Sequence, residues 1–493
     1  MIAADATMAR VTDRHPTATA AADLDAGLTA DELAEITGGT LLSRSSRRVR
    51  GGAVDSRAVE PGNLFVALPG ERTDGHAFVG VALGAGAAGV LVERAPEPGD
   101  LVGHDASVIL VGDPLRALQA VAVAWRARFD PLVVGLTGSI AKTSTKEATA
   151  AVLGAAMPTL RNEGNLNNEI GLPLTLLRLR AEHRAAVLEM GMYVGGEIAD
   201  LARIGRPEIG VVTAVQPVHL SRIGSIDAVE QAKGELVAAL PDDGVAILNA
   251  DDERVLRMSA RTAARVMTYG FALDADVRAE QVGSRGADGM AFDLVSPAGR
   301  RPVAIPGLGR LAVHNALAGA AVGLAAGVRL DTIVGALGRG WTALHRGQLV
   351  RAGGVTIVDD SYNASPGSVI AALELLGGMP GRKIAVLGEM LELGDAHEHE
   401  AGHERAGIAA APIVDRLVVV GDGASAVAAG ARGAGLAGDA IAVVVDRAAA
   451  RDLLLAELRP GDVVLVKASR GIALDLLVDE LAAALGPAAE PAP

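Results

Sequence analysis

Short apolar runs alternate along this chain with longer segments of helical periodicity. Runs rich in Val, Ile, Leu and Ala occupy residues 131–137, 185–190, 209–215 and 245–250, and the segment 226–240 carries apolar residues at helical spacing. Fully apolar runs of this length are typical of parallel strands that helices cover on both faces. The pattern therefore predicts an α/β fold with a largely parallel sheet in the middle of the chain.

Breaks in this alternation predict three domains in the 493 residues. Asp113 and Pro114 suit the cap and first turn of a helix, so a new unit is expected to begin there. Strand-like pieces with glycine turns predict an antiparallel appendage at 267–306, followed by a helix from about His314. The expected parts are a disordered lead-in at 1–27, a small mixed α/β domain at 28–112, a central domain at 113–344, a Rossmann-like α/β domain at 345–486 and a disordered tail at 487–493.

Composition excludes several classes of protein. The net charge of −14 and the aromatic content of 2% argue against nucleic-acid binding, which needs a basic footprint. Apolar runs all fall short of the roughly 18 residues that a membrane-spanning helix needs, and the N-terminus lacks the apolar stretch of a secretory signal. The absence of cysteine excludes disulfides and thiolate-bound metals. We expect a cytoplasmic monomer.

Lysine is rare in this chain. Of 45 basic residues only five are lysines. A GC-rich genome that writes most basic positions as arginine explains the bias, but it makes each remaining lysine a candidate for chemistry that needs a compact ammonium group. The five are Lys142, Lys146, Lys233, Lys383 and Lys467.

A glycine-bearing loop lies between an apolar strand and a helix at residues 135–145. Backbone N–H groups at such a loop attract phosphate, so we predict a P-loop-type ATPase domain in which Lys142 contacts the β- and γ-phosphates and Thr143 reaches Mg²⁺. Ala141 stands where a P-loop usually has glycine, which means either strain or dihedral angles that alanine tolerates. The alternative is a strand-to-helix turn with an incidental lysine. The residues expected at ATP are Thr137, Gly138, Ser139, Ile140, Ala141, Lys142, Thr143 and Ser144.

The motifs that follow resemble those of the ATP-dependent Mur ligases, which build the peptidoglycan stem peptide. The family loop reads Gly-x-x-Gly-x-x-Gly-Lys-Thr, from which Ala141 departs, and Leu311 replaces the usual histidine after Gly-Arg. The matching blocks are NEGNLNNEIGLPLTLL (162–177), LEMG at Glu189, VHL at His219, AKGEL at Lys233, LNADD at Asn249, ALHRGQ (343–348), VDDSYNASPGSV (358–369) and GEMLELGDAHEHE (388–400).

The resemblance implies a ligase that activates a carboxylate as an acyl phosphate and captures it with an amine. It implies two Mg²⁺ ions, one held by Thr143 and Glu189, the other by Glu189, His219 and a Lys233 carbamylated by CO₂. Arginine cannot form such a carbamate, because its pKa keeps it protonated. The alternatives are an exposed Lys233 on an amphipathic helix and a core His219 satisfied by a backbone carbonyl. The catalytic residues are thus expected to be Lys142, Glu189, His219 and Lys233.

The resemblance also implies further contacts. Asn249 and Asn315, with Asp251 nearby, are expected at the nucleotide, and Arg346 and Asp360 are expected to approach it when the domains close. Lys467, Ser469 and Arg470 either contact the amine or cap a helix, and Lys383 has no assigned role. The residues expected at the other substrates are Ser56, Arg57, Thr73, Asp74, Asn165, Asn167, Asn168, Tyr362, Asn363, Lys467, Ser469 and Arg470.

Two third-domain blocks indicate which substrates the ligase joins. DSYNASP and GEMLELG resemble the blocks of one member of the family, and this resemblance implies D-alanyl-D-alanine as the amine and UDP-N-acetylmuramoyl-tripeptide as the acceptor. Addition of a diamino acid is the alternative within the family, although its typical D-N-P-R segment is absent from the sequence. A non-catalytic nucleotide-binding scaffold is the alternative from another class, if Ala141 disables the loop.

Overall fold

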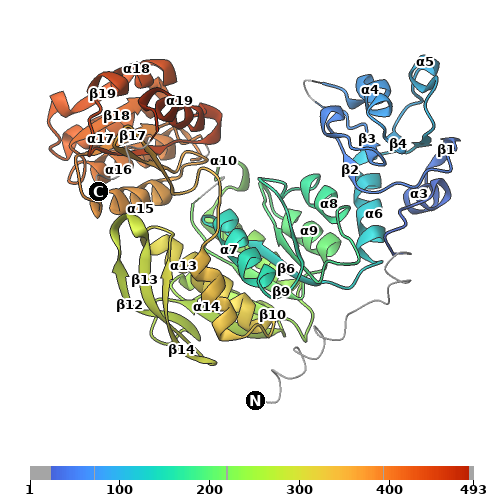
Figure 1. Ribbon diagram of the computed structural model, residues 1–493, viewed down its shortest axis with the longest axis horizontal. Helices are drawn as coiled ribbons and strands as arrows, with labels where there is room; N and C mark the ends of the chain where they lie inside the picture. The colour runs from blue at the N-terminus through green and yellow to red at the C-terminus, as the bar shows by residue number, and fades with distance from the viewer. Residues whose placement is uncertain (1–23, 71–72, 218–219, 392, 488–493) are drawn as a thin grey trace.

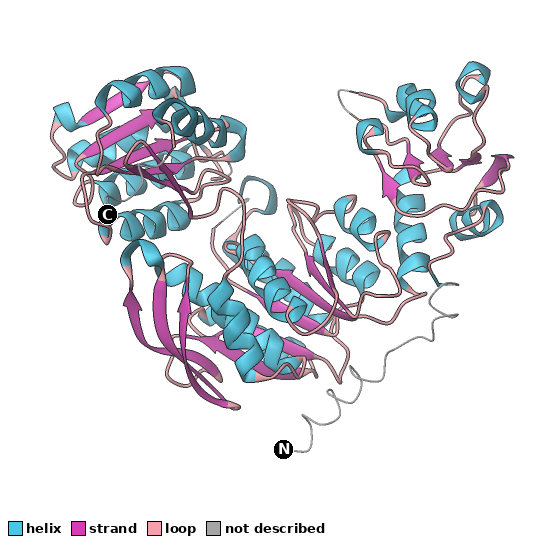
Figure 2. Cartoon of the chain, in the orientation of Figure 1, coloured by secondary structure: helices cyan, strands magenta, loops and turns pink. Residues whose placement is uncertain are grey.

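The computed structural model describes residues 24–70, 73–217, 220–391 and 393–487. Its three sheets lie along an arc, with the first and the third at the two ends and the second between them (Figure 1). Helices flank strands in each of the three parts (Figure 2). The predicted α/β class and the mostly parallel sheets are confirmed.

The first sheet has the order β1-β5-β4-β3-β2, and all neighbours are parallel except β1 and β5. A capping box between Thr29 and Glu32 fixes the start of α3. The predicted cap is also confirmed, because the Asp113 carboxylate accepts from the Arg116 N–H at the start of α6. The elements are β1 (Thr40–Ser43), β2 (Gly52–Ala53), β3 (Leu64–Val66), β4 (Gly89–Val92), β5 (Ser107–Leu110), α3 (Ala30–Thr37), α4 (Val79–Gly84), α5 (Pro98–Leu101) and α6 (Pro114–Arg126).

The central sheet has nine strands in the order β14-β13-β12-β11-β10-β9-β6-β8-β7. Strands β6 to β12 run parallel, and only β13 and β14 are antiparallel to their neighbours. Its strands are β6 (Leu132–Thr137), β7 (Thr159–Arg161), β8 (Ala185–Glu189), β9 (Ile209–Val212), β10 (Val245–Asn249), β11 (Arg265–Gly270), β12 (Val277–Ser284), β13 (Met290–Ser296) and β14 (Gly299–Ile305). Its helices are α7 (Lys142–Gly154), α8 (Gly171–Leu176), α9 (Glu197–Gly205), α10 (Leu220–Ile223), α11 (Ile226–Ala238), α12 (Glu253–Arg257), α13 (Gly309–Ala325) and α14 (Leu330–Arg339).

Two sequence-based expectations for this part are corrected. The antiparallel pairing expected within 267–306 is confirmed for β12, β13 and β14, but β11 pairs in parallel with β10 and with β12, so the segment continues the central sheet. The following helix begins at Gly309 rather than near His314. The glycines at 307 and 309 in the sequence are typical of a loop. In the structure, Gly309 is already the first residue of α13.

The third sheet has the order β15-β16-β20-β17-β18-β19 and is parallel except for the hairpin of β15 and β16. The apolar runs at 355–360, 383–389, 416–422, 441–445 and 462–469 predict five strands, which are β16 to β20, whereas the edge strand β15 was missed. The elements are β15 (Gln348–Ala352), β16 (Val355–Asp359), β17 (Lys383–Gly388), β18 (Arg416–Val420), β19 (Ile441–Val444), β20 (Val463–Lys467), α15 (Pro366–Gly377), α16 (Ala396–Ala410), α17 (Ser425–Gly433), α18 (Arg447–Glu457) and α19 (Asp475–Leu485).

The ends of the described chain are more ordered than expected. The Asp25 carboxylate accepts from the Ala181 N–H at 2.9 Å, and the Gly27 carbonyl accepts from an arginine of the same part of the chain. Pro487 pairs with Ala352 in an isolated bridge. The expected lead-in and tail are therefore wrong for 24–27 and 487, and their remainders lie outside the described residues. Within the described ranges, no helix is both long and apolar enough to cross a membrane.

Candidate active site

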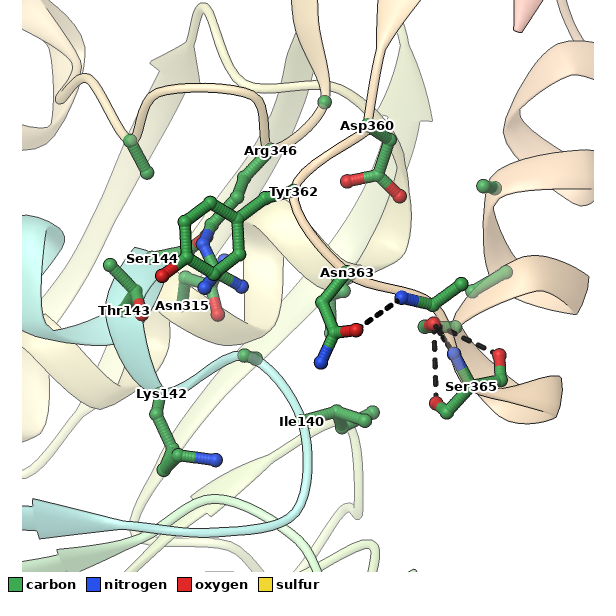
Figure 3. Close-up of a pocket in the computed structure, with 18 of the residues that line it drawn as sticks. Ile140, Lys142, Thr143, Ser144, Asn315, Arg346, Asp360, Tyr362, Asn363 and Ser365 are labelled. Atoms are coloured by element: carbon green, nitrogen blue, oxygen red, sulfur yellow. Dashed lines mark hydrogen bonds between the residues drawn. The ribbon is translucent and has the colours of Figure 1, made fainter. Parts of the chain in front are cut away.

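A cleft of about 1130 Å³ lies between the central and the third sheets. Its walls come from the loop after β6, the ends of β8 and β20, helix α13 and the segment after β16. Figure 3 shows side chains of the loop and of the third part facing one another across this space. The predicted residues that line it are Ser139, Ile140, Ala141, Lys142, Thr143, Ser144, Asn165, Asn167, Asn168, Glu189, Lys233, Asn315, Arg346, Asp360, Tyr362, Asn363, Lys467, Ser469 and Arg470.

The loop between β6 and α7 is tied to the segment that follows β9. The Ser139 hydroxyl donates to the Gln216 carbonyl at 3.1 Å and accepts from its N–H at 2.8 Å. Thr213 Oγ1 donates to the Ile140 carbonyl at 2.6 Å. A Cβ at Gly138 would lie 1.8 Å from Thr213 Oγ1, so only glycine fits there. The loop is thus held in shape by two residues, Thr213 and Gln216, that no motif had singled out.

Ala141 adopts a left-handed backbone conformation, with φ 66° and ψ 0°. The sequence left open whether this position was strained or compatible with alanine. Because a Cβ in the left-handed region approaches the following carbonyl, the position costs about 1 kcal/mol relative to glycine. The loop therefore keeps the shape that glycine usually supplies, at a modest cost in stability.

Ala141→Gly is expected to raise the midpoint of thermal unfolding by about 2–4 °C, because it removes about 1 kcal/mol of backbone strain. Scanning calorimetry measures this shift. Ala151→Gly is the matched control, since it lies inside α7 with ordinary helical geometry and is expected to lower the midpoint. A lower midpoint for Ala141→Gly would contradict the assignment of strain to this residue.

Helix α7 begins at Lys142, directly after the loop, and no side chain caps its N-terminus. First-turn N–H groups and the helix dipole attract an anion there. The Lys142 ammonium donates to the Gly138 carbonyl at 2.8 Å, across the mouth of the loop. Thr145 Oγ1 donates to Asn315 Oδ1 at 2.9 Å, which fixes α13 beside α7. The arrangement suits a phosphate chain.

Glu189 ends β8 and is only 2% exposed. Asn167 Nδ2 donates to its Oε1 at 2.8 Å. Its Oε2 is buried and has no hydrogen-bond partner among the described residues. An unpaired carboxylate oxygen is costly to bury, and a bound cation would satisfy it.

Lys233 projects from α11 and is 2% exposed, so the exposed-helix alternative is wrong. Burial, and then the positive charge of Lys142, hold the pKa of its ammonium group well below the usual value. A depressed pKa keeps the amine neutral and nucleophilic at a pH where a free lysine is charged.

The third part contributes charge and an aromatic ring to the cleft. The Lys467 ammonium contacts Asp360 Oδ2 at 2.6 Å and donates to the Asn363 carbonyl at 2.9 Å. The Tyr362 ring lies 4.1 Å from the Arg346 guanidinium carbon, and its hydroxyl accepts from Arg470 Nη1 at 2.7 Å. These contacts bring residues from two blocks of the sequence together at one wall of the cleft.

The side chains of Asn168 and Ser469 hydrogen-bond to backbone N–H groups of the protein. The Asn168 carboxamide oxygen accepts from the Gly171 N–H at the start of α8, and the Ser469 hydroxyl accepts from the Leu391 N–H. The Asn168 contact is a local turn contact, whereas the Ser469 side chain does not cap the short helix that follows it and instead joins the end of β20 to the segment after β17. Both residues also line the cleft.

Some predicted site residues do not line the cleft. Asn249 Nδ2 donates to the Thr213 carbonyl, and the Asp251 carboxylate accepts from the Phe271 and Ala272 N–H groups. Thr137 ends β6 and Gly138 begins the loop, and neither is part of the cleft lining; the Thr137 hydroxyl donates to the Met190 carbonyl. His219 lies outside the described residues. The other predicted residues outside the cleft belong to the part that contains the first sheet, and they are Ser56, Arg57, Thr73 and Asp74. Arg57 forms an ion pair with Asp55, and Asp74 contacts Arg94 and His76.

The cleft also contains residues that the sequence did not indicate. Tyr193 and Glu197 come from the segment after β8, Arg310 comes from α13, and Trp341 precedes the third part. Tyr193, Glu197 and Trp341 belong to no motif, so spacing alone carried no signal for them, and Arg310 entered the sequence analysis only as the arginine that precedes Leu311. Leu311, noted only as a departure, is part of the lining as well.

The donor set for a divalent cation is sparse in the described ranges, where no group of three His, Cys, Asp or Glu side chains gathers. Glu189 nevertheless fits such an ion, because its buried Oε2 lacks a partner and faces a cleft that Thr143 and Lys233 also line. A neutral lysine that gained a carboxyl group would supply a second anionic ligand.

Comparison with protein families matches three parts of the chain. A model described as the Mur ligase middle domain covers residues 136–323, one described as the Mur ligase, glutamate ligase domain covers 345–470, and one described as the Mur ligase family, catalytic domain covers 48–126. Together they span most of the described chain.

Curated relatives and solved structures agree with these matches. UDP-N-acetylmuramoyl-tripeptide--D-alanyl-D-alanine ligase of Mycobacterium tuberculosis is 40% identical over 88% of this chain and 94% of the relative, and that of Escherichia coli is 40% identical over 74% and 80%. MurF from Acinetobacter baumannii has a TM-score of 0.81 at 30% identity, covering 92% of this chain and 99% of that one. MurF ligase from Thermotoga maritima in complex with ADP has a TM-score of 0.76 at 28% identity, covering 89% and 98%.

Proposed function

Because this chain belongs to the Mur ligase family, we propose that it joins D-alanyl-D-alanine to UDP-N-acetylmuramoyl-tripeptide at the expense of ATP. One observation carries the proposal: the phosphate loop, Glu189, Lys233 and the DSYNASP segment all line a single cleft. The relatives that carry this name match 74–88% of the chain at 40% identity, which supports these substrates over a diamino acid. The reaction would complete the cytoplasmic UDP-linked pentapeptide precursor of peptidoglycan.

The division of labour follows the three parts. We assign residues 28–112 to binding of the UDP end, 113–344 to ATP and the reacting carboxylate, and 345–486 to the amine. Ser56, Arg57, Thr73 and Asp74 would contact the UDP group from the first part. None of these four residues lines the cleft. This arrangement suits a long substrate whose UDP end binds the first part while its peptide end reaches the reacting centre.

ATP would lie with its phosphates on the loop. N–H groups of residues 139–144 and the start of α7 would hold them, and Lys142 would exchange the Gly138 carbonyl for the β- and γ-phosphates. Asn315 would meet the nucleoside, as Thr145 already orients its amide. Positioning and charge neutralisation are what phosphoryl transfer chiefly requires.

Mg²⁺ would be held by Thr143, Glu189, His219 and a carbamylated Lys233, and when bound it would neutralise charge on the transferring phosphoryl group. The neutral Lys233 amine would attack CO₂, forming an N–C bond and releasing one proton to solvent. The depressed pKa of Lys233, caused by burial and by the charge of Lys142, supports this, because it increases the fraction of the lysine that is present as the free amine.

The chemical steps use the cleft from both sides. The terminal carboxylate of the tripeptide would attack the γ-phosphorus of ATP, forming the acyl phosphate and displacing ADP. The amine of D-alanyl-D-alanine would then attack the acyl carbon, lose a proton and displace inorganic phosphate. The amine would approach from the wall of the cleft that is lined by Lys467, Arg470, Tyr362 and Asn363. Closure of the third part would bring Arg346 and Asp360 to the nucleotide and exclude water from the acyl phosphate.

Mass spectrometry of the reaction product tests the proposal. The purified protein, ATP and Mg²⁺ are incubated with UDP-N-acetylmuramoyl-tripeptide or the corresponding dipeptide, each paired with D-alanyl-D-alanine or a diamino acid. We expect product only from the tripeptide with D-alanyl-D-alanine. Product from the dipeptide with a diamino acid would reassign the enzyme within the family. If no pair yields product, but Ala141→Gly does, the chain is a scaffold with a disabled loop.

A further inference from the structure

Lys146 is a wholly buried lysine in α7 that plays no part in the chemistry described so far. Its ammonium donates to the Asn162 carbonyl at 2.6 Å and contacts Glu147 Oε1 at 3.1 Å. Glu147 is shared with Arg161, whose Nε lies 2.7 Å from Oε2. An apolar side chain of similar length would fill this space without the desolvation cost of a charge, so packing alone does not account for a lysine.

Asn162 connects Lys146 to Glu189. Its side chain is fully buried, and Oδ1 accepts from the Glu189 N–H at 3.0 Å while Nδ2 donates to the Glu189 carbonyl at 3.2 Å. Both main-chain polar groups of Glu189 are thus held by one carboxamide. Asn162 follows β7 directly and Glu189 ends β8, the parallel neighbour of β7, so the contact joins the carboxyl ends of two strands.

The Glu189 side chain is held from the opposite side by Asn167. Asn167 Nδ2 donates to Oε1, and the Asn167 carbonyl accepts from the Gly191 N–H at 2.8 Å. Oε2 is left buried and without a partner among the described residues, facing the cleft. The direction of this oxygen therefore depends on where Asn162 and Asn167 hold the residue.

We propose that Lys146 is a positioning residue for the cation site of this ligase, acting through Asn162 on Glu189. The proposal rests on the proposed function. Neither Lys146 nor Asn162 lines the cleft, so neither touches ATP or the ion. The Lys146 ammonium fixes the Asn162 carbonyl, the Asn162 carboxamide fixes the Glu189 main chain, and Glu189 Oε2 is aimed as a result. Outer contacts of this kind commonly change metal affinity by about 10- to 100-fold when they are removed.

The proposal can be tested without turnover by measuring the affinity of the protein for Mn²⁺. Electron paramagnetic resonance measures this binding in the presence of a non-hydrolysable ATP analogue. Lys146→Met keeps the length of the side chain and removes its charge, and Asn162→Leu keeps the volume and removes the amide. We expect about 10- to 100-fold weaker Mn²⁺ binding in each variant. The double variant should be little worse than either single variant, because both act through one chain of contacts. Lys383→Met, a lysine outside the cleft, is the control and should bind Mn²⁺ normally.

Unchanged Mn²⁺ affinity in a folded variant of either residue would overturn the proposal, as would additive effects in the double variant. If Lys146→Met fails to fold by circular dichroism, Asn162→Leu decides alone. The positioning role of Lys146 and the ligase function can be refuted independently of each other. A wild-type protein that binds Mn²⁺ with the analogue but ligates no substrate pair would refute the ligase function, while the Mn²⁺ series would still test the positioning role.

Discussion

Lys142→Met is expected to lower kcat of the ligase reaction by about 10²- to 10³-fold, the range seen when one preorganised group is removed from a developing negative charge. The ammonium lies at the uncapped start of α7, where it is the side-chain cation of the phosphate loop. Methionine has a similar length and leaves the loop contacts of Ser139 and Thr213 in place. A coupled assay for phosphate release, with all substrates saturating, measures the loss.

This prediction has two controls. Lys383→Met changes a lysine that lies outside the cleft and should retain wild-type kcat. The thermal unfolding midpoint of Lys142→Met should stay close to that of the wild type, since the side chain is only half-buried. A folded Lys142→Met protein with kcat near wild type would show that the loop does not bind the transferring phosphoryl group.

Lys233→Arg is expected to lower activity by about 10²-fold or more, because a guanidinium cannot take up CO₂ and would place a permanent cation where an anionic ligand is needed. The Lys233 side chain is almost fully buried and its pKa is depressed by burial and by Lys142, so the wild-type amine is suited to form a carbamate. The wild-type protein in ¹³C-bicarbonate should show a carbamate carbonyl resonance in its ¹³C NMR spectrum, and Lys233→Arg should lack it.

The NMR signal separates the carbamate from a simple packing effect. Lys233→Met removes the amine without adding charge and should lose both the resonance and the activity. Lys383→Arg should keep both. If the wild-type resonance is absent while the enzyme is active, Lys233 acts as an amine and the carbamate proposal fails.

The sequence predicted those features that depend on local pattern. The apolar run before Gly135, the glycine spacing and the helix after Lys142 together predicted the strand, loop and helix that the structure contains. The choice of Lys233 as a site residue came from the family motif and from the scarcity of lysine, because the apolar pattern of its helix allowed an exposed lysine as well. The helix cap at Asp113 was equally local and was found.

Features that depend on distant backbone groups were not predictable. Asn249 resembled a nucleotide ligand, yet its amide is used by the Thr213 carbonyl, 36 residues away in the chain. The scarcity of lysine marked Lys146 as a candidate, but its contact was not predictable, because its partner is the main-chain carbonyl of Asn162, which any residue could supply. Short strands such as β7, with three residues, lacked enough alternation to be recognised.

The central claim is that this cleft makes an acyl phosphate from ATP and a peptide carboxylate. Transfer of ¹⁸O tests it most directly, with UDP-N-acetylmuramoyl-tripeptide labelled at both oxygens of the terminal carboxylate and D-alanyl-D-alanine as the amine. When the amine displaces the acyl phosphate, the bridging oxygen leaves with phosphorus. The account predicts one ¹⁸O in each released phosphate and one in the new amide. Unlabelled phosphate, or phosphate release without a peptide product, would contradict it.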